Sequence, residues 1–250
     1  MKIAVWLACL ILSGAALLFG YTAYSVARVE LVYPPQGDFI DIGGTRLHYV
    51  DVGQGMPIVL LHGANATTRE FDSSFGPLLS KRYRVVAFDR PGYGYSERGE
   101  GHSDPAVQAA LIHDAIASLG IDRAVLVGHS LGGAVALAFA LRYPDVAAGV
   151  VLIGGVAYPW KTGVAWFNHV AQWPVVGPLF AHTLVYPVGR WLLPEAVRAV
   201  FTPESPPAEY ERRHGTVLAL RPKAFRASAQ DLLHLSDHMA KQSVRYPELS

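Results

Sequence analysis

The feature that most constrains the fold is a serine held between glycines at the junction of an apolar strand and a helix. The run Gly128-His129-Ser130-Leu131-Gly132 directly follows the apolar segment Ala124–Val127 and overlaps the start of a helix predicted over Leu131–Arg142. A backbone that turns sharply from strand to helix has no room for a Cβ atom two residues before or after the serine. Such a turn exposes the hydroxyl of Ser130 and directs the following N–H groups toward the same point.

The pattern of residues 39–156 alternates between strands and helices. Continuous apolar runs are typical of strands buried on both faces of a sheet. A helix opens at Asp104-Pro105, an N-cap followed by a proline at the first helical position, and stops before Gly120. We expect an α/β fold with a mostly parallel, twisted sheet flanked by helices, whose chemistry gathers at the carboxyl ends of the strands. The predicted strands are 39–42, 45–52, 57–61, 84–88, 124–127 and 150–153.

Residues 1–28 predict a membrane anchor. Ile3–Ala27 is a run of 25 residues without a charge. As a helix it spans roughly 37 Å, more than the ~30 Å hydrocarbon core of a bilayer. Tyr21 and Tyr24 lie near its far end, where aromatic rings favour the membrane interface. The alternative is a cleaved signal peptide, because Ser25-Val26-Ala27 offers small residues for cleavage, although signal peptides carry shorter apolar runs.

The flanking residues suggest an orientation for this anchor. Lys2 and the α-amino group favour a cytoplasmic N-terminus. We therefore expect a single-pass membrane protein with its domain outside the cytoplasm, or a secreted protein if the segment is cleaved. Residues 29–38, which include Pro34-Pro35, are predicted to form a short, stiff linker.

Charge and cysteine content exclude several other classes. The formal net charge is +1, from 21 basic and 20 acidic residues, so the chain lacks the electrostatic footprint of a nucleic-acid-binding protein. The single cysteine excludes both a disulfide framework and a thiolate zinc site.

Two further motifs accompany the serine turn. They are Leu60-Leu61-His62-Gly63-Ala64 and Phe88-Asp89-Arg90-Pro91-Gly92-Tyr93-Gly94-Tyr95-Ser96. In order and spacing the three motifs resemble the ends of the third, fourth and fifth strands of the α/β-hydrolase superfamily, in its capped branch with a serine nucleophile. The resemblance is strong over residues 39–156. It implies the fold but says little about the substrate.

The resemblance also implies roles for matching residues. Ser130 corresponds to the nucleophile, and the backbone N–H groups of Leu131 and Ala64 correspond to the oxyanion hole, a pair of donors worth roughly 3–4 kcal/mol each. A serine at this position disfavours epoxide hydrolase and haloalkane dehalogenase chemistry, which the family performs with an aspartate. The resemblance implies no cofactor, and neither motif histidine corresponds to the catalytic base. The residues that shape the motifs are His62, Gly63, Gly128, His129 and Gly132.

Residues 157–242 are predicted to form a helical cap inserted after the sixth strand. Four of the five tryptophans fall here, and we expect short helices to bury them against one another. The alternatives are an apolar substrate cleft roofed by some of them, or a second membrane-facing surface. His234 and His238 lie one turn apart, but Leu235 stands where a zinc motif of this kind needs glutamate, so we expect no metal site.

A serine nucleophile of this family is followed by an acid and then a histidine along the chain. The resemblance places the acid after a strand that follows the cap, and the alternative position holds Gly154-Gly155. Residues 243–250 are predicted to begin the return to the core. We therefore expect a C-terminally incomplete hydrolase that lacks the last two strands, by roughly 70–80 residues, and leaves the sixth strand uncovered.

Two classes of function stay open. The first is a membrane-tethered serine hydrolase acting on a small apolar ester or related acyl substrate, from which carbon–carbon bond hydrolase and cofactor-free haloperoxidase activities are not separable. The second is a non-catalytic hydrolase-like module, or an inactive fragment, because the acid and histidine are missing while the serine turn is intact. The sequence does not define an oligomeric state.

Overall fold

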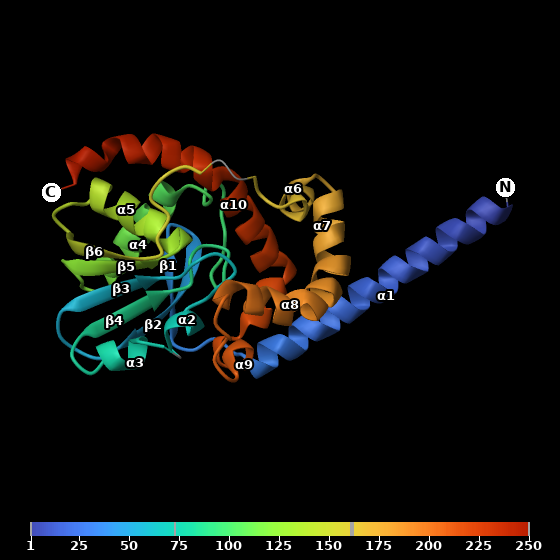
Figure 1. The fold of residues 1–250 in the computed structure, drawn as a ribbon, viewed down its shortest axis with the longest axis horizontal. Coiled ribbons are helices and arrows are strands. Elements are labelled where there is room, and N and C mark those ends of the chain that lie inside the picture. Colours follow the sequence, from blue (N-terminus) through green and yellow to red (C-terminus); the bar gives the residue numbers. More distant parts are fainter. Residues whose placement is uncertain (1, 73, 161–162, 250) are drawn as a thin grey trace.

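The computed structural model describes residues 2–72, 74–160 and 163–249, and it contains a six-stranded sheet with helices on both faces (Figure 1). The spatial order is β1-β2-β4-β3-β5-β6, in which β3 pairs in parallel with β4 and β5, β5 pairs in parallel with β6, and β1 and β2 are antiparallel. This confirms the predicted α/β class. The strands are β1 (Asp38–Ile42), β2 (Thr45–Val52), β3 (Pro57–Leu61), β4 (Arg84–Phe88), β5 (Ala124–His129) and β6 (Ala147–Ile153).

The helices that flank the sheet begin where the sequence predicts. The side chain of Asp104 caps α4 (Pro105–Ser118) by accepting a hydrogen bond of 2.8 Å from the N–H of Ala106. Together with α5 (Leu131–Arg142), this helix covers one face of the sheet through Ile112, Ile116 and Phe139. The short helices α2 (Arg69–Asp72) and α3 (Gly76–Leu79) lie on the other face, where Phe71 joins the apolar cluster.

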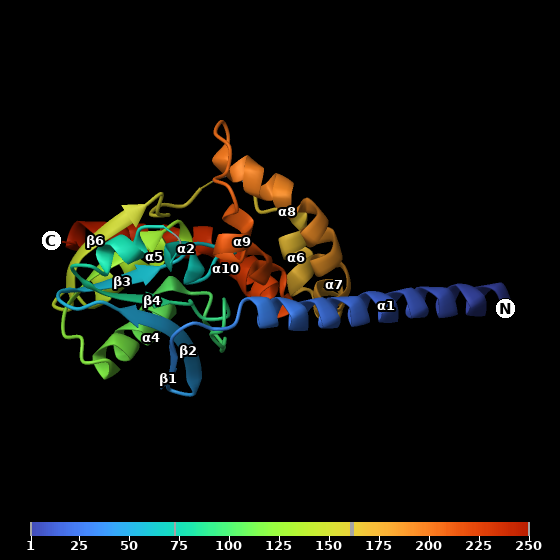
Figure 2. The same ribbon diagram turned by 90° about the horizontal axis from the view of Figure 1, so that it is seen from below.

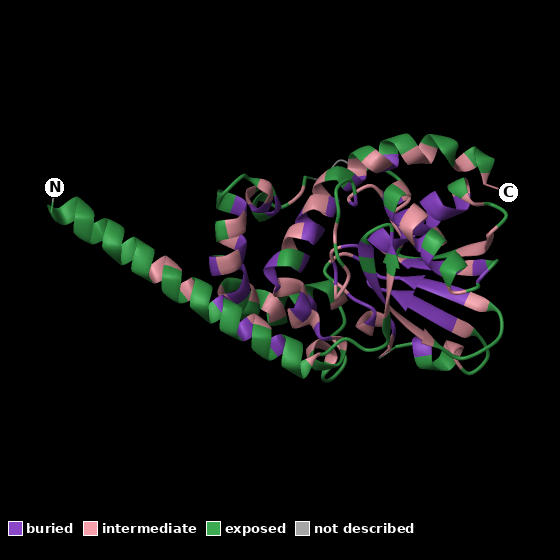
Figure 3. Ribbon diagram, turned by 180° about the vertical axis from the view of Figure 1, so that it is seen from behind, coloured by how far each residue is buried: buried purple, intermediate pink, exposed green. Residues whose placement is uncertain are grey.

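The outer edge of β6 is partly exposed. Val151, Leu152 and Ile153 are 48%, 39% and 38% accessible, whereas the matching apolar residues of β3 and β5 are buried (Figure 3). Within the described residues β6 is thus an edge strand, as the sequence predicts.

Helices from two parts of the chain stand beside this sheet (Figures 1 and 2). The long helix α1 (Lys2–Val32) packs with its C-terminal half against η1 (Ala181–Val185) and α8 (Tyr186–Phe201). The predicted linker of 29–38 is therefore wrong in its first part, because the helix continues through Val32 and buries Val29 against Tyr186 and Leu218. The cap elements are α6 (Trp166–Gln172), α7 (Val176–Phe180), the π-helical η1 (Ala181–Val185), α8 (Tyr186–Phe201), α9 (Tyr210–His214), the 3-10 helix η2 (Thr216–Leu220) and α10 (Pro222–Gln242).

The expectation that the tryptophans of the cap bury one another is wrong for three of them. Trp166, Trp173 and Trp191 are 69%, 55% and 80% accessible. Trp160 differs, because it is partly buried against the main core. Much of the apolar surface of the cap therefore faces outward.

The last helix returns to the core earlier than the predicted position of 243. Leu235 and Met239 of α10 are buried in the main core, and the amide of Gln242 donates to the carbonyl oxygen of Ala134 over 3.0 Å. The segment that follows, η3 (Ser243–Glu248), is a 3-10 helix.

A buried ion network ties α10 to the loop after β4. The guanidinium of Arg90 and the carboxylate of Asp231 are both almost completely buried and lie 3.0 Å apart. Arg98 approaches the other carboxylate oxygen to 2.6 Å, and the hydroxyl of Tyr93 donates to Asp231 over 3.0 Å. The charge of Asp231 is thus balanced by two arginines, which offsets the cost of removing it from water.

We expect Asp231→Ala to lower the free energy of unfolding by about 3–5 kcal/mol, because it leaves the charge of Arg90 buried without its partner. Asp237→Ala is the matched control, since Asp237 lies on the exposed side of the same helix. Denaturant unfolding of the two variants in detergent micelles measures the difference. Equal stabilities would contradict a structural role for the network.

Candidate active site

Ser130 lies at the sharp turn from β5 into α5. Its backbone has a φ of 50° and a ψ of −118°, an unfavourable conformation for a residue with a side chain. The N–H of Ser130 donates to the carbonyl oxygen of Ile153 over 3.0 Å, and its own carbonyl oxygen accepts from Gly133 and Val156, each over 2.9 Å. The end of β6 thus holds the strained serine in place.

The glycines of this turn are required by close backbone contacts. A Cβ atom added to Gly132 would lie 2.0 Å from the carbonyl oxygen of Leu61, at the end of β3. A Cβ on Gly128 would lie 2.4 Å from the carbonyl oxygen of Gly132. The sequence predicts that both positions require glycine. In the structure the obstructing atoms belong to the backbone, which cannot move aside as a flexible side chain does.

The structure brings the His62-Gly63-Ala64 loop next to the serine. A Cβ atom on Gly63 would lie 3.1 Å from the Cβ of Ser130, so the loop after β3 and the serine turn meet at Gly63. Ala64 follows it directly, and Leu131 is the first residue of α5. The sites predicted for the nucleophile and the two oxyanion donors therefore belong to two loops in contact.

His62 stabilises this loop through hydrogen bonds. Its side chain is fully buried, with Nδ1 2.7 Å from the carbonyl oxygen of Gly63 and Nε2 accepting from the N–H of Arg90 over 3.0 Å. Burial, reinforced by the charge of Arg90, lowers the pKa of His62 to about 4. A neutral imidazole with both nitrogens engaged fits the predicted role in loop shape.

Arg90 fixes the same loop through its guanidinium. Nε donates to the carbonyl oxygen of His62 over 2.8 Å, and Nη2 donates to that of Gly63 over 3.1 Å. The neighbouring Asp89 is buried and accepts hydrogen bonds from the N–H groups of Thr68 and Tyr95. The second motif thus forms the scaffold under the first.

A carboxylate that the sequence pattern did not predict lies beside His129. Glu70 of α2 forms an ion pair with Nδ1 of His129 and accepts from the N–H of Gly63 over 3.2 Å. The hydrogen bond that His129 donates to Glu70 raises the pKa of His129. Burial alone raises the pKa of Glu70, but the bond and charge of His129 reverse this and lower it. The only sequence signal for this contact was a histidine directly before the serine turn. No local pattern connects that histidine with a residue in the helix after β3.

No hydrogen bond to the hydroxyl of Ser130 is formed by the side chains of residues 2–72, 74–160 and 163–249. His234 bonds to the carbonyl oxygen of Gln230, and His238 lies 3.6 Å from Asp104, so neither histidine of α10 serves the serine. The same described ranges hold no cluster of three or more His, Cys, Asp or Glu side chains that could bind a metal ion.

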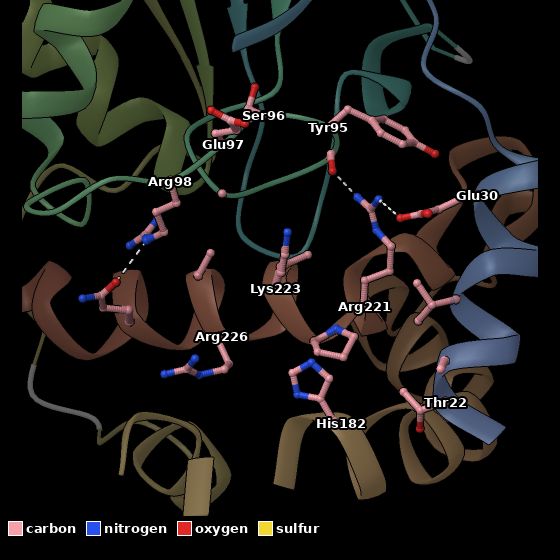
Figure 4. A pocket seen from close by; sticks show the side chains of 18 of the residues that line it. Thr22, Glu30, Tyr95, Ser96, Glu97, Arg98, His182, Arg221, Lys223 and Arg226 are labelled. Atoms are coloured by element: carbon pink, nitrogen blue, oxygen red, sulfur yellow. Dashed lines mark hydrogen bonds and ion pairs between the residues drawn. The ribbon is translucent and has the colours of Figure 1, made fainter. Parts of the chain in front are cut away.

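The largest described cavity lies elsewhere, between α1, α10 and the loop after β4 (Figure 4). Its volume is about 820 Å³, and neither Ser130 nor Ala64 lines it. Arg221 closes one end through an ion pair with Glu30 and a hydrogen bond to the carbonyl oxygen of Gly94. Its chemistry is therefore separate from that of the serine turn.

Comparison with known proteins shows what this arrangement is similar to. The family model described as the alpha/beta hydrolase fold matches residues 56–176. The chain is 36% identical over 127 residues to the 2-hydroxy-6-oxo-6-phenylhexa-2,4-dienoate hydrolase of Burkholderia cepacia, a match that covers 49% of this chain and 43% of the relative. It is 35% identical over 139 residues to the 2-hydroxymuconate semialdehyde hydrolase of Pseudomonas putida, covering 53% and 50% respectively.

A solved structure, Cfl2 from Burkholderia cenocepacia, shares the fold with a TM-score of 0.67 and 23% identity, covering 84% of this chain and 74% of that one. The chain spans about half the length of the curated relatives that it matches. Residues 56–176 thus resemble the α/β-hydrolase family, and the described chain has the α/β-hydrolase fold.

We expect Gly132→Ala to lower the free energy of unfolding by about 3 kcal/mol, because the new methyl group overlaps the backbone of β3. Gly149→Ala is the matched control, since the space around Gly149 is open and its φ is not positive. Thermal unfolding measures both. A Gly132→Ala variant as stable as Gly149→Ala would show that the close contact does not exist.

Stability is also expected to fall between pH 6.5 and pH 4. In this window the unfolded chain protonates His62, whose ordinary pKa is about 6.5, whereas the folded chain with its pKa of about 4 does not. The slope from one such proton is at most about 1.4 kcal/mol per pH unit. The raised pKa of His129 adds no slope there, because its contribution is complete below pH 6.5.

Denaturant unfolding across this range measures the slope in the wild type and in His62→Gln, which should lose the part that His62 contributes. His102, whose pKa is also lowered by burial, retains its own part in both proteins. His234→Gln alters an exposed histidine and should retain the full slope. Should His62→Gln fail to fold, NMR titration of the wild type gives the pKa directly, and a value near 6.5 would refute the account.

Proposed function

We propose that this protein is a membrane-tethered serine hydrolase that acts on an ester or related acyl substrate. Ser130 is the nucleophile, and the N–H groups of Ala64 and Leu131 form the oxyanion hole. The observation that carries the proposal is the strained Ser130 in contact with the loop that presents Ala64. Strain of this kind is retained where surrounding structure imposes it, and it is concentrated at reactive sites.

The proposed reaction begins with attack of the Ser130 oxygen on the carbonyl carbon of the substrate. The carbonyl π electrons move to oxygen, and the two N–H groups stabilise the resulting anion. Collapse of this intermediate expels the leaving group, and water then releases the acyl group from the serine. The proton of the Ser130 hydroxyl passes to a general base. Neither histidine of α10 takes this role, because His234 bonds to the carbonyl oxygen of Gln230 and His238 lies beside Asp104.

The names of the relatives narrow the class of substrate. The Burkholderia cepacia relative is named as a hydrolase of a 6-oxo-dienoate, in which the 6-oxo carbon is a carbonyl electrophile. An oxyanion hole suits a ketone carbonyl as well as an ester carbonyl, because both develop negative charge on oxygen. The proposal therefore includes two reactions. Ester hydrolysis is the preferred one, and hydrolysis of a carbon–carbon bond next to a ketone is the other.

The proposed tether is α1. It is the one helix among the described residues that is long and apolar enough to span a bilayer, and the apolar window within it is not buried by the rest of the protein. Lys2 favours a cytoplasmic N-terminus, which places the hydrolase domain on the other side of the membrane. The alternative assignment of α1 as a cleaved signal gives a secreted domain.

Labelling with a fluorophosphonate probe tests the chemistry. We expect the full chain to form a covalent adduct with the probe, whereas Ser130→Ala forms none, because the reaction needs an activated serine. Ser118→Ala, a substitution on the exposed side of α4, is the matched control and should label like the wild type. Labelling is read by mass spectrometry of the intact protein.

A folded wild-type chain that stays unlabelled would overturn the catalytic proposal. It would favour the second candidate, a non-catalytic hydrolase-like module. The observation in favour of this candidate is that no described side chain bonds to the hydroxyl of Ser130.

A further inference from the structure

The length of α1 sets where the rest of the molecule meets a bilayer. A helix rises 1.5 Å per residue, so about 20 residues are needed to cross a hydrocarbon core of ~30 Å. Counted from Ile3, the first residue after Lys2, that stretch ends at Thr22. Yet the cap contacts α1 before this point, because the ring of Phe19 stacks on His182 of η1 with 5.6 Å between ring centroids. A spanning α1 therefore brings the cap to the membrane surface.

The contact between α1 and the cap continues without a gap. The ring of Tyr21 packs edge-on against Tyr186 at 6.2 Å, and Thr22, Ser25 and Val29 are buried. The cap is thus fixed along α1 rather than attached through a loose linker. Figures 1 and 2 show α6 and α7 at the end of the domain from which the free part of α1 projects.

Most outward side chains of α6 and α7 are apolar, and His169 is an exposed polar exception. We call this surface the cap tip, and it comprises residues 166–180. Val175, in the connection between the two helices, is 81% accessible, and the tryptophans beside it are more than half accessible. Exposed apolar patches of this kind mark interaction surfaces, and tryptophan favours the membrane interface. The exposed large apolar residues are Trp166, Phe167, Trp173, Val175, Val176 and Leu179.

Cationic side chains gather just behind the cap tip. Lys223 and Arg226 line the cavity of about 820 Å³ together with Thr22 of α1 (Figure 4). Arg98, which is paired with Asp231, and the carboxylates Glu30 and Glu97 line it as well. Since Thr22 ends the stretch needed to cross the hydrocarbon, the part of this cavity that borders α1 lies at the depth of the lipid headgroups. Basic side chains at this depth attract anionic phospholipids. An apolar surface with a cationic layer behind it matches the order of acyl chains and phosphates in a bilayer.

We propose that the cap tip is a second membrane-binding surface, whose apolar side chains enter the boundary between acyl chains and headgroups beside α1. This inference rests on the proposed membrane anchor. It commits to a phospholipid bilayer as the occupant, because the fixed contact between α1 and the cap leaves the cap tip beside the lipid. A second copy of the chain is the competing occupant.

Tryptophan quenching by lipid tests both the anchor and the cap tip. The full chain is reconstituted in vesicles of phosphatidylcholine and phosphatidylglycerol with brominated or unbrominated acyl chains, and the quenched share of emission is compared with that of single substitutions. We expect Trp6→Phe, Trp166→Phe and Trp173→Phe each to remove a clear part of the quenching. Trp160→Phe is the matched control, because Trp160 packs on the core and should contribute almost none.

The outcomes separate the two proposals. If Trp6→Phe removes quenching and the two cap-tip variants do not, the cap tip is not in the membrane although the anchor is. If none of the three removes quenching, the anchor itself is wrong and the cap-tip proposal falls with it. Shielding of Trp166 and Trp173 that appears only at high protein-to-lipid ratio, without lipid quenching, would assign the surface to a second copy and overturn the proposal.

Val175→Asp is a second, independent test that leaves every tryptophan in place. A charge at the most exposed position of the cap tip should be excluded from the bilayer, so lipid quenching should fall to the level that Trp6 alone provides. Val52→Asp, at an exposed position on β2 away from the cap, should leave quenching unchanged. Unchanged quenching in Val175→Asp would contradict insertion of the cap tip.

Discussion

The structure depends on how closely the turn after β5 approaches the end of β3. Gly132 has no space for even one methyl group against the backbone of Leu61, and Gly63 meets Ser130 in the same region. These contacts force a strained conformation on Ser130, which hydrogen bonds from β6 then maintain. Because the contacts join the carboxyl ends of neighbouring parallel strands, the sheet itself sets the geometry of the candidate active site.

Support for this geometry extends into the cap through one arginine. Arg90 holds the carbonyl groups of His62 and Gly63 with one part of its guanidinium and meets Asp231 of α10 with another. Placement of the cap and shape of the oxyanion loop are therefore coupled through a single buried group. A displacement of α10 would therefore change the position of Gly63 through Arg90.

Local sequence patterns were sufficient to predict the strands, the helix caps and the serine turn, because each depends on residues close together in the chain. The partner of Arg90 was not predictable, since Asp231 lies 141 residues away and only the tertiary fold brings the two together. The same holds for Glu70 beside His129. The exposure of the tryptophans was also missed, because an apolar side chain carries no information about whether protein or lipid covers it.

The rigid union of α1 with the cap has a consequence for how the molecule meets its surroundings. A domain on a flexible linker can tilt freely relative to a bilayer. In this protein, the packing of the cap along α1 fixes the tilt of the domain relative to that helix. Ser130 then keeps a constant distance and orientation relative to any bilayer that holds α1. If α1 anchors the protein as proposed, encounters with a substrate dissolved in the bilayer become a search in two dimensions.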